Sequence, residues 1–151
     1  MPKMKHKLLI IDDDTDLTVL LAWHLSRDYD VIVASECLRG HEVSLFRKHR
    51  PHLILLELDL QGPSGVEILR DILHCDAKAV VIIVSSNPSL QLARDTIKMG
   101  ARDYVSKPFN NEEIVLTMRH AQQARIAHWL DPPGSWASIS WPGVFAQAIT
   151  D

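Results

Sequence analysis

Side chains that can do chemistry stand where short apolar runs of this sequence end. Asp12 and Asp13 follow the run LLII, Glu57 closes LILLE, Ser85 follows VVIIV and Lys107 closes DYVSK. Carboxylates that meet at one edge repel each other, so a divalent cation or a lysine must offset their charge. Mg²⁺ prefers carboxylate and water oxygens, whereas lysine offers a point charge and serine a hydrogen bond to a phosphoryl group. If these ends meet, the residues predict a site for Mg²⁺ and a phosphoryl group.

Alternating hydrophobic periods predict the elements that must position these side chains. Short apolar runs, typical of strands buried on both faces, are separated by segments with the spacing of helices. In the first of these segments, the predicted inward face is formed by Leu17, Leu20, Leu21, His24 and Leu25. Strand and helix alternate five times, which predicts an α/β fold with a doubly wound, five-stranded parallel sheet. Ligands of such sheets bind at the carboxyl ends of the strands. The predicted strands are residues 7–11, 30–35, 52–58, 79–86 and 103–107.

Over residues 5–129 the chain resembles the receiver domain of two-component response regulators, which has a flavodoxin-like fold. The matching pieces stand in the family's order: LLIIDDD, RPHLILLEL, QGPSGVEILR, VVIIVSS and GARDYVSKPF. The resemblance implies an acidic pair, a switch hydroxyl, a switch aromatic residue and a lysine that pairs with the acids or a phosphoryl group. These roles fall on Asp12 and Asp13, Ser85, Tyr104 and Lys107, respectively.

Glu57 departs from the pattern of that family. Its position matches the aspartate that accepts a phosphoryl group from a histidine kinase, and Asp59 matches the residue whose backbone carbonyl binds Mg²⁺. The resemblance therefore implies a metal site at Asp12, Asp13, Glu57 and Asp59. One extra methylene pushes the Glu57 carboxylate into the space of the phosphoryl group, and in-line transfer depends on positioning.

Three interpretations of Glu57 stay open. In the first, its charge is a fixed, partial mimic of the phosphorylated state, since a phosphoryl group carries about −1.5 to −2. In the second, the domain works only through protein contacts. In the third, phosphorylation persists on Glu57 or, by a shift of register, on Asp59. We expect a stand-alone, atypical receiver, not an enzyme, that contacts a histidine kinase or a downstream protein through residues 88–129.

Purely structural roles are also open for the predicted site residues. The acids at 12–14 fit a helix N-cap, Lys107 a surface lysine, Ser85 a strand-end polar residue and Tyr104 a packing residue. A different class is a Mg²⁺-dependent phosphohydrolase of the haloacid-dehalogenase type. Its aspartate nucleophile is followed by a second aspartate two residues on, and LELDL imitates this pattern with Asp59 as the acid in use.

Composition limits the class of protein and its compartment. With 151 residues, 46% of them hydrophobic, and a net charge of −3, the chain suits a globular protein and argues against nucleic acid as a partner. No apolar run approaches a membrane span, and Cys37 and Cys75 fit free thiols in the cytoplasm.

We expect a receiver domain over 1–130. A tail over 131–151, with Trp136 and Trp141, would cover the domain, form a docking or homodimer contact, or be disordered.

Overall fold

The structure, a computed structural model, describes residues 4–35, 40–62, 64–86 and 89–130, except for the side chains of 124–130. The predicted tail, 131–151, lies outside the described residues, as does Cys37. The other cysteine, Cys75, is a free thiol.

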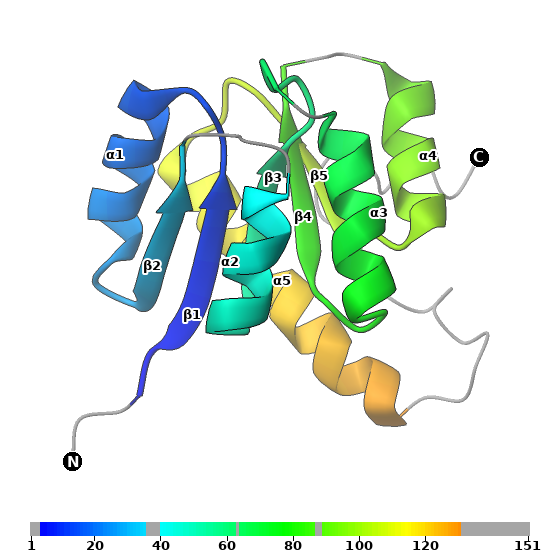
Figure 1. Cartoon of the computed structure of the whole chain (residues 1–151). Coiled ribbons are helices and arrows are strands. Elements are labelled where there is room, and N and C mark those ends of the chain that lie inside the picture. The colour runs from blue at the N-terminus through cyan, green and yellow to red at the C-terminus, as the bar shows by residue number, and fades with distance from the viewer. Residues whose placement is uncertain (1–3, 36–39, 63, 87–88, 131–151) are drawn as a thin grey trace.

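Five strands and five helices alternate along the chain, as the sequence predicts (Figure 1). The strands are β1 His6–Ile11, β2 Tyr29–Ala34, β3 Leu53–Glu57, β4 Val81–Ser85 and β5 Asp103–Ser106. The helices are α1 Thr15–Leu25, α2 His41–His49, α3 Gly65–Cys75, α4 Leu90–Met99 and α5 Asn111–Leu130. All strand pairs are parallel, in the order β2-β1-β3-β4-β5. The predicted doubly wound α/β fold is confirmed.

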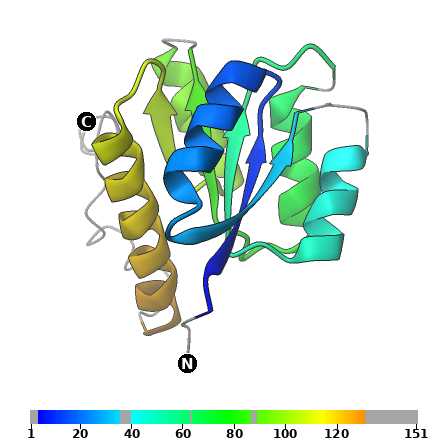
Figure 2. The same cartoon turned by 90° about the vertical axis from the view of Figure 1, so that its left-hand side faces the viewer.

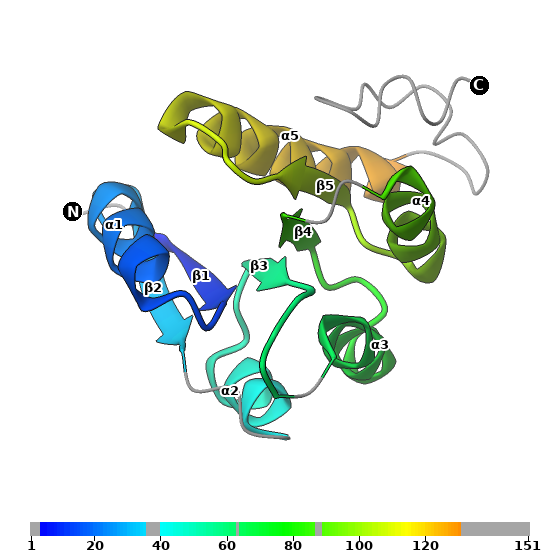
Figure 3. The same cartoon turned by 90° about the horizontal axis from the view of Figure 1, so that it is seen from above.

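Helices cover both faces of the sheet, which explains why the strands read as uninterrupted apolar runs. Helices α1 and α5 lie on one face, and α2, α3 and α4 lie on the other (Figures 2 and 3). Every residue of β3 and of β4 is buried. Alternate side chains of each strand enter two hydrophobic clusters, one on each side of the sheet. A strand buried on both faces has no polar side to alternate with its apolar one.

The inward face predicted for α1 is wrong in two of its members. Leu20 is 66% exposed and His24 is exposed, while Thr18 is buried. The Thr18 hydroxyl donates a hydrogen bond to the carbonyl of Thr15, so this polar side chain is satisfied inside the protein. The buried face therefore turns toward Thr18, and Leu20 joins Trp23 on the exposed surface.

None of the helices in the described part of the chain combines the length and the apolar character that a membrane crossing requires.

Candidate functional site

Four of the predicted site residues lie at the carboxyl ends of four different strands. Asp12 follows β1, Glu57 ends β3, Ser85 ends β4, and Lys107 comes directly after β5. The parallel register places Glu57 beside Val84 and Ser85 beside Ser106, so these ends are level across the sheet. The sheet therefore brings these polar groups to one edge.

Lys107 bridges the two buried acids of this edge. Its Nζ lies 2.8 Å from Oδ2 of Asp12 and 2.8 Å from Oε2 of Glu57. The contact with Asp12 is a hydrogen bond donated by the ammonium group, while that with Glu57 has the geometry of an ion pair rather than of a directional hydrogen bond. The side chains of Asp12 and Glu57 are only 6% and 4% exposed. One cation thus serves two carboxylates that are largely withdrawn from water.

The second oxygen of each of these acids accepts a backbone hydrogen bond. Oδ1 of Asp12 accepts from the N–H of Asp14 at 2.9 Å, and Oε1 of Glu57 accepts from the N–H of Asp59 at 3.0 Å. Asp14 also caps α1, because its own carboxylate accepts from the N–H of Leu17. Asp12 therefore does not cap α1; its carboxylate belongs to the cluster with Lys107.

The protonation equilibria reflect burial and these contacts. Burial raises the pKa of the Glu57 carboxyl, and the nearby charge of Asp12 adds to the rise, although the contact with Lys107 and the hydrogen bond from the N–H of Asp59 lower it in part. Burial lowers the pKa of Lys107, but the contacts with Asp12 and Glu57 and the negative charges of these two acids outweigh burial, so that its pKa is raised. The lysine therefore stays charged, and Glu57 holds a proton more readily than a free glutamate.

Asp13 and Asp59 hydrogen-bond elsewhere. Oδ2 of Asp13 accepts a hydrogen bond from the backbone N–H of Gln61 at 2.8 Å. Asp59 is exposed, and its Oδ2 accepts a long hydrogen bond of 3.4 Å from the hydroxyl of Ser85. The four predicted metal ligands therefore divide into a pair held by Lys107 and two acids held by other groups.

This division decides how well the residues fit a magnesium ion. The donor types are suitable, but Asp12 and Glu57 each direct one oxygen at Lys107, and one oxygen of Asp13 is taken by Gln61. Within the described residues, no three His, Cys, Asp or Glu side chains are grouped so that they could hold a metal ion. As arranged, the site does not fit Mg²⁺, and the ammonium group of Lys107 offsets the acidic charge instead. Magnesium stays a prediction from the sequence.

The two predicted switch residues are in contact with each other and buried. Ser85 has 0% and Tyr104 4% of its surface exposed, and their side chains are hydrogen-bonded. Burial raises the pKa of the Tyr104 hydroxyl, and the negative charges of Glu57 and Asp59 raise it further, while the hydrogen bond with Ser85 lowers it in part. Tyr104 packs in the cluster on the α2, α3 and α4 side of the sheet. Tyr104 therefore lies between the acids Glu57 and Asp59, whose charges act on its hydroxyl, and the hydrophobic core beneath these helices.

Gly65 is a supporting residue that the sequence analysis did not single out. A Cβ atom at this position would overlap the backbone carbonyl of Glu57 and the Cα atom of Leu58. The N–H of Gly65 also donates to the carbonyl of Leu58. The first residue of α3 thus packs directly on the chain that carries Glu57. The cap of α3 is the preceding residue, Ser64, whose hydroxyl accepts from the N–H of Val66, so nothing in the local sequence pattern marks Gly65 itself.

The chain is similar in sequence and in fold to known signalling proteins. A family model described as "Response regulator receiver domain" matches residues 8–119. Sporulation initiation phosphotransferase F of Bacillus subtilis is 30% identical over 112 residues, which cover 74% of this chain and 89% of that protein. Chemotaxis protein CheY of the same species is 26% identical over 112 residues, which cover 74% of this chain and 93% of CheY. A solved signal receiver domain from Vibrio parahaemolyticus is 26% identical, with a TM-score of 0.73 over 84% of this chain and 97% of that one.

Proposed function

Because the chain belongs to the response regulator receiver domain family of two-component signalling, we propose that it signals with Glu57 as a fixed, partial substitute for a phosphorylated aspartate. In this proposal Lys107, which would otherwise face an incoming phosphoryl group, is already paired with the carboxylate of the protein itself. The distance of 2.8 Å between Lys107 Nζ and Glu57 Oε2 carries the proposal.

The charge of Glu57 would couple the acidic site to the two switch residues electrostatically. Its charge acts on the hydroxyl of Tyr104, which is hydrogen-bonded to Ser85. A carboxylate has one negative charge and two oxygens, whereas a phosphoryl group has about −1.5 to −2 charges and three acceptor oxygens. The substitution would therefore hold the switch in a weakly signalling state that does not depend on a kinase.

The output of this state would be contact with another signalling protein. We infer that the contact face comprises α4, β5 and α5 up to residue 129, where Leu90 is 44% and Leu116 50% exposed. A histidine kinase or a downstream effector is the proposed partner. A homodimer, the cytoplasmic location and the lack of nucleic-acid binding stay predictions.

Intact-mass measurement after treatment with acetyl phosphate and Mg²⁺ tests the role of Glu57. We expect no adduct on the native chain, because its carboxylate is displaced by one methylene and engaged by Lys107. The Glu57→Asp variant should gain one labile phosphoryl group, and Glu57→Gln, the matched uncharged control, should gain none. A stable phosphoryl adduct on the native protein would overturn the proposal.

The phosphohydrolase alternative has a separate test. Turnover of a chromogenic phosphate ester with Mg²⁺, lost in Asp59→Asn, would favour that enzyme over the receiver. We propose that Asp59 has no such role, since its carboxylate is exposed and accepts a hydrogen bond from Ser85.

A further inference from the structure

Glu42, which lies away from the residues discussed so far, is a buried carboxylate without a partner. It has 0% of its surface exposed, and neither of its two oxygens accepts a hydrogen bond from the residues that the structure describes. Buried polar side chains nearly always have a hydrogen-bond partner, and a buried carboxylate without one carries a large desolvation cost. A native protein that retains such a group invites a specific explanation.

The position of Glu42 in its helix supplies only part of that explanation. Glu42 lies in the first turn of α2, where the helix dipole favours negative charge. The N-cap of this helix is Gly40, which provides no side-chain hydrogen bond. The dipole, however, acts equally on an exposed glutamate, so it accounts for the residue type and not for its burial.

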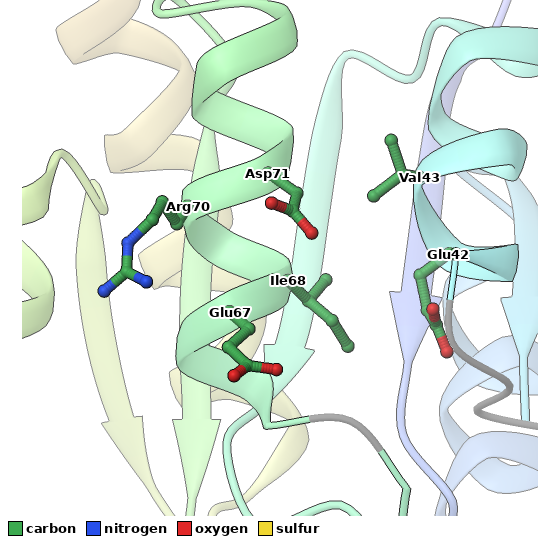
Figure 4. A pocket seen from close by; sticks show the side chains of 7 residues that line it. Glu42, Val43, Glu67, Ile68, Arg70 and Asp71 are labelled. Carbon is green, nitrogen blue, oxygen red and sulfur yellow. The ribbon is translucent and has the colours of Figure 1, made fainter.

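Glu42 lines a pocket between α2 and α3 with a volume of about 200 Å³ (Figure 4). Glu67 and Asp71 line the same pocket from α3, and both are exposed to solvent. Arg70 also lines the pocket, but in Figure 4 its side chain points away from α2, whereas that of Asp71 points toward it. The pocket therefore has a buried carboxylate inside, two further carboxylates toward solvent, and no guanidinium group directed into it from Arg70.

An extended organic cation fits this arrangement better than a metal ion. Within the described residues, no three acidic, histidine or cysteine side chains are close enough together to hold a metal. A guanidinium group, by contrast, spreads five N–H donors over a plane and can bond to several separated carboxylates at once. Its hydrogen bonds to ionised carboxylates are also the stronger kind.

We propose that the pocket between α2 and α3 binds the guanidinium group of an arginine side chain from a partner protein. Glu42 would accept its hydrogen bonds inside the pocket, while Glu67 and Asp71 would attract the positive charge to the entrance. This binding site involves neither Lys107 nor the contact face on α4, β5 and α5, so it does not depend on the role proposed for Glu57.

A titration followed by amide NMR tests the site on the full chain. The probe is the peptide acetyl-Gly-Arg-Gly-amide, and its uncharged counterpart carries citrulline in place of arginine. We expect saturable shifts of the amides of 40–43 and 67–71 with the arginine peptide and none with the citrulline peptide. Equal responses to the two peptides, or shifts spread over the whole surface, would overturn the proposal.

Two glutamate variants separate binding from folding. Glu42→Gln should weaken the binding of the arginine peptide by at least about tenfold in Kd, because a charged hydrogen-bond acceptor is lost. The same variant should raise the Tm of the free protein by a few degrees, because a buried charge without a partner is removed. Glu112→Gln is the matched control, since Glu112 also lies in the first turn of its helix but is exposed. It should leave both quantities unchanged.

Two further probes test the class of ligand. Spermidine represents a free polyamine and MgCl₂ represents a metal ion. Binding of either that is tighter than that of the arginine peptide and is lost in Glu42→Gln would assign the pocket to that ligand and overturn the proposal. A Glu42→Gln variant that is less stable than the native protein would also overturn it, because Glu42 would then be a structural residue.

Discussion

The ammonium group of Lys107 and the carboxylate of Glu57 are 2.8 Å apart, and the same ammonium group lies 2.8 Å from Asp12. One positive charge therefore faces two negative ones in a region with little water. Burial, and to a smaller extent the negative charge of Asp12, raises the pKa of Glu57. The excess negative charge makes the site sensitive to any change that removes the cation.

Replacement of Lys107 by methionine should destabilise the fold by about 3 kcal/mol near pH 7. The change leaves two buried carboxylates without their cation, which costs more than the loss of an exposed pair. Chemical denaturation measures the effect. Lys98→Met, at an exposed lysine of α4, should stay within about 0.5 kcal/mol of the native protein. The loss at Lys107 should shrink as the pH falls and Glu57 becomes protonated; a loss independent of pH would contradict the charge argument.

The pKa of Tyr104 should fall in the Glu57→Gln variant. The negative charge of Glu57 raises the pKa of this hydroxyl, so its removal makes ionisation of the tyrosine easier. The chain has 2 tyrosines, which allows each to be followed by NMR of labelled tyrosine rings. Tyr29 is the internal control, because its pKa is raised by burial and by Asp28 and not by Glu57. An unchanged titration of Tyr104 would mean that Glu57 is not coupled to the switch residues.

The Gly65→Ala variant should lose about 1–3 kcal/mol of stability, because the new methyl group overlaps the backbone of Glu57 and Leu58. Backbone atoms cannot rotate away as a flexible side chain can. The start of α3 or the end of β3 must therefore shift, and the amide resonances of Glu57 and Asp59 should move. A variant with native stability and native resonances would show that this contact is not restrictive.

The stability of the fold should fall as the pH rises from about 4 to about 7 because of Asp103. Burial raises the pKa of this carboxyl to about 7, although the hydrogen bond from the N–H of Tyr104 lowers it in part. Between the unfolded and folded pKa values the native state binds the extra proton, so the free energy of unfolding decreases with pH. The total change is at most roughly 4 kcal/mol.

Asp103→Asn should remove this pH dependence, because the amide oxygen can still accept from the N–H of Tyr104 while no charge has to be buried. Urea denaturation at a series of pH values measures the slope for both proteins. Asp30→Asn, at an exposed position of β2, should retain the native slope. The explanation fails if Asp103→Asn and the native protein have the same slope.

The sheet and its carboxyl edge were predictable because strands buried on both faces leave an unambiguous apolar signal. The buried face of α1 was not, since Thr18 is buried by virtue of a local hydrogen bond that hydrophobic spacing does not register. Sequence position placed the acids at one edge, but it did not determine their partners. Asp13 turns to the N–H of Gln61, a donor from a distant loop that no spacing rule identifies.

Glu42 shows a similar limit. A glutamate in the first turn of a helix is usually a surface residue that complements the helix dipole. Its burial depends on how α2 packs beside α3, which is a tertiary property. Only the three-dimensional arrangement reveals that this carboxylate has no hydrogen-bond partner in the described part of the chain.

The Asp12–Lys107 contact also bears on the order in which the molecule can assemble. The two residues are 95 positions apart, and β1 and β5 are separated in the sheet by β3 and β4. Contacts so distant in sequence require a large loop to close and tend to form late in folding. During synthesis, the two acids are therefore without their lysine until all five strands of the sheet have been made. A nascent chain that stops before β5 would hold repelling carboxylates at an unfinished edge, so the charged site can form only once all five strands are present.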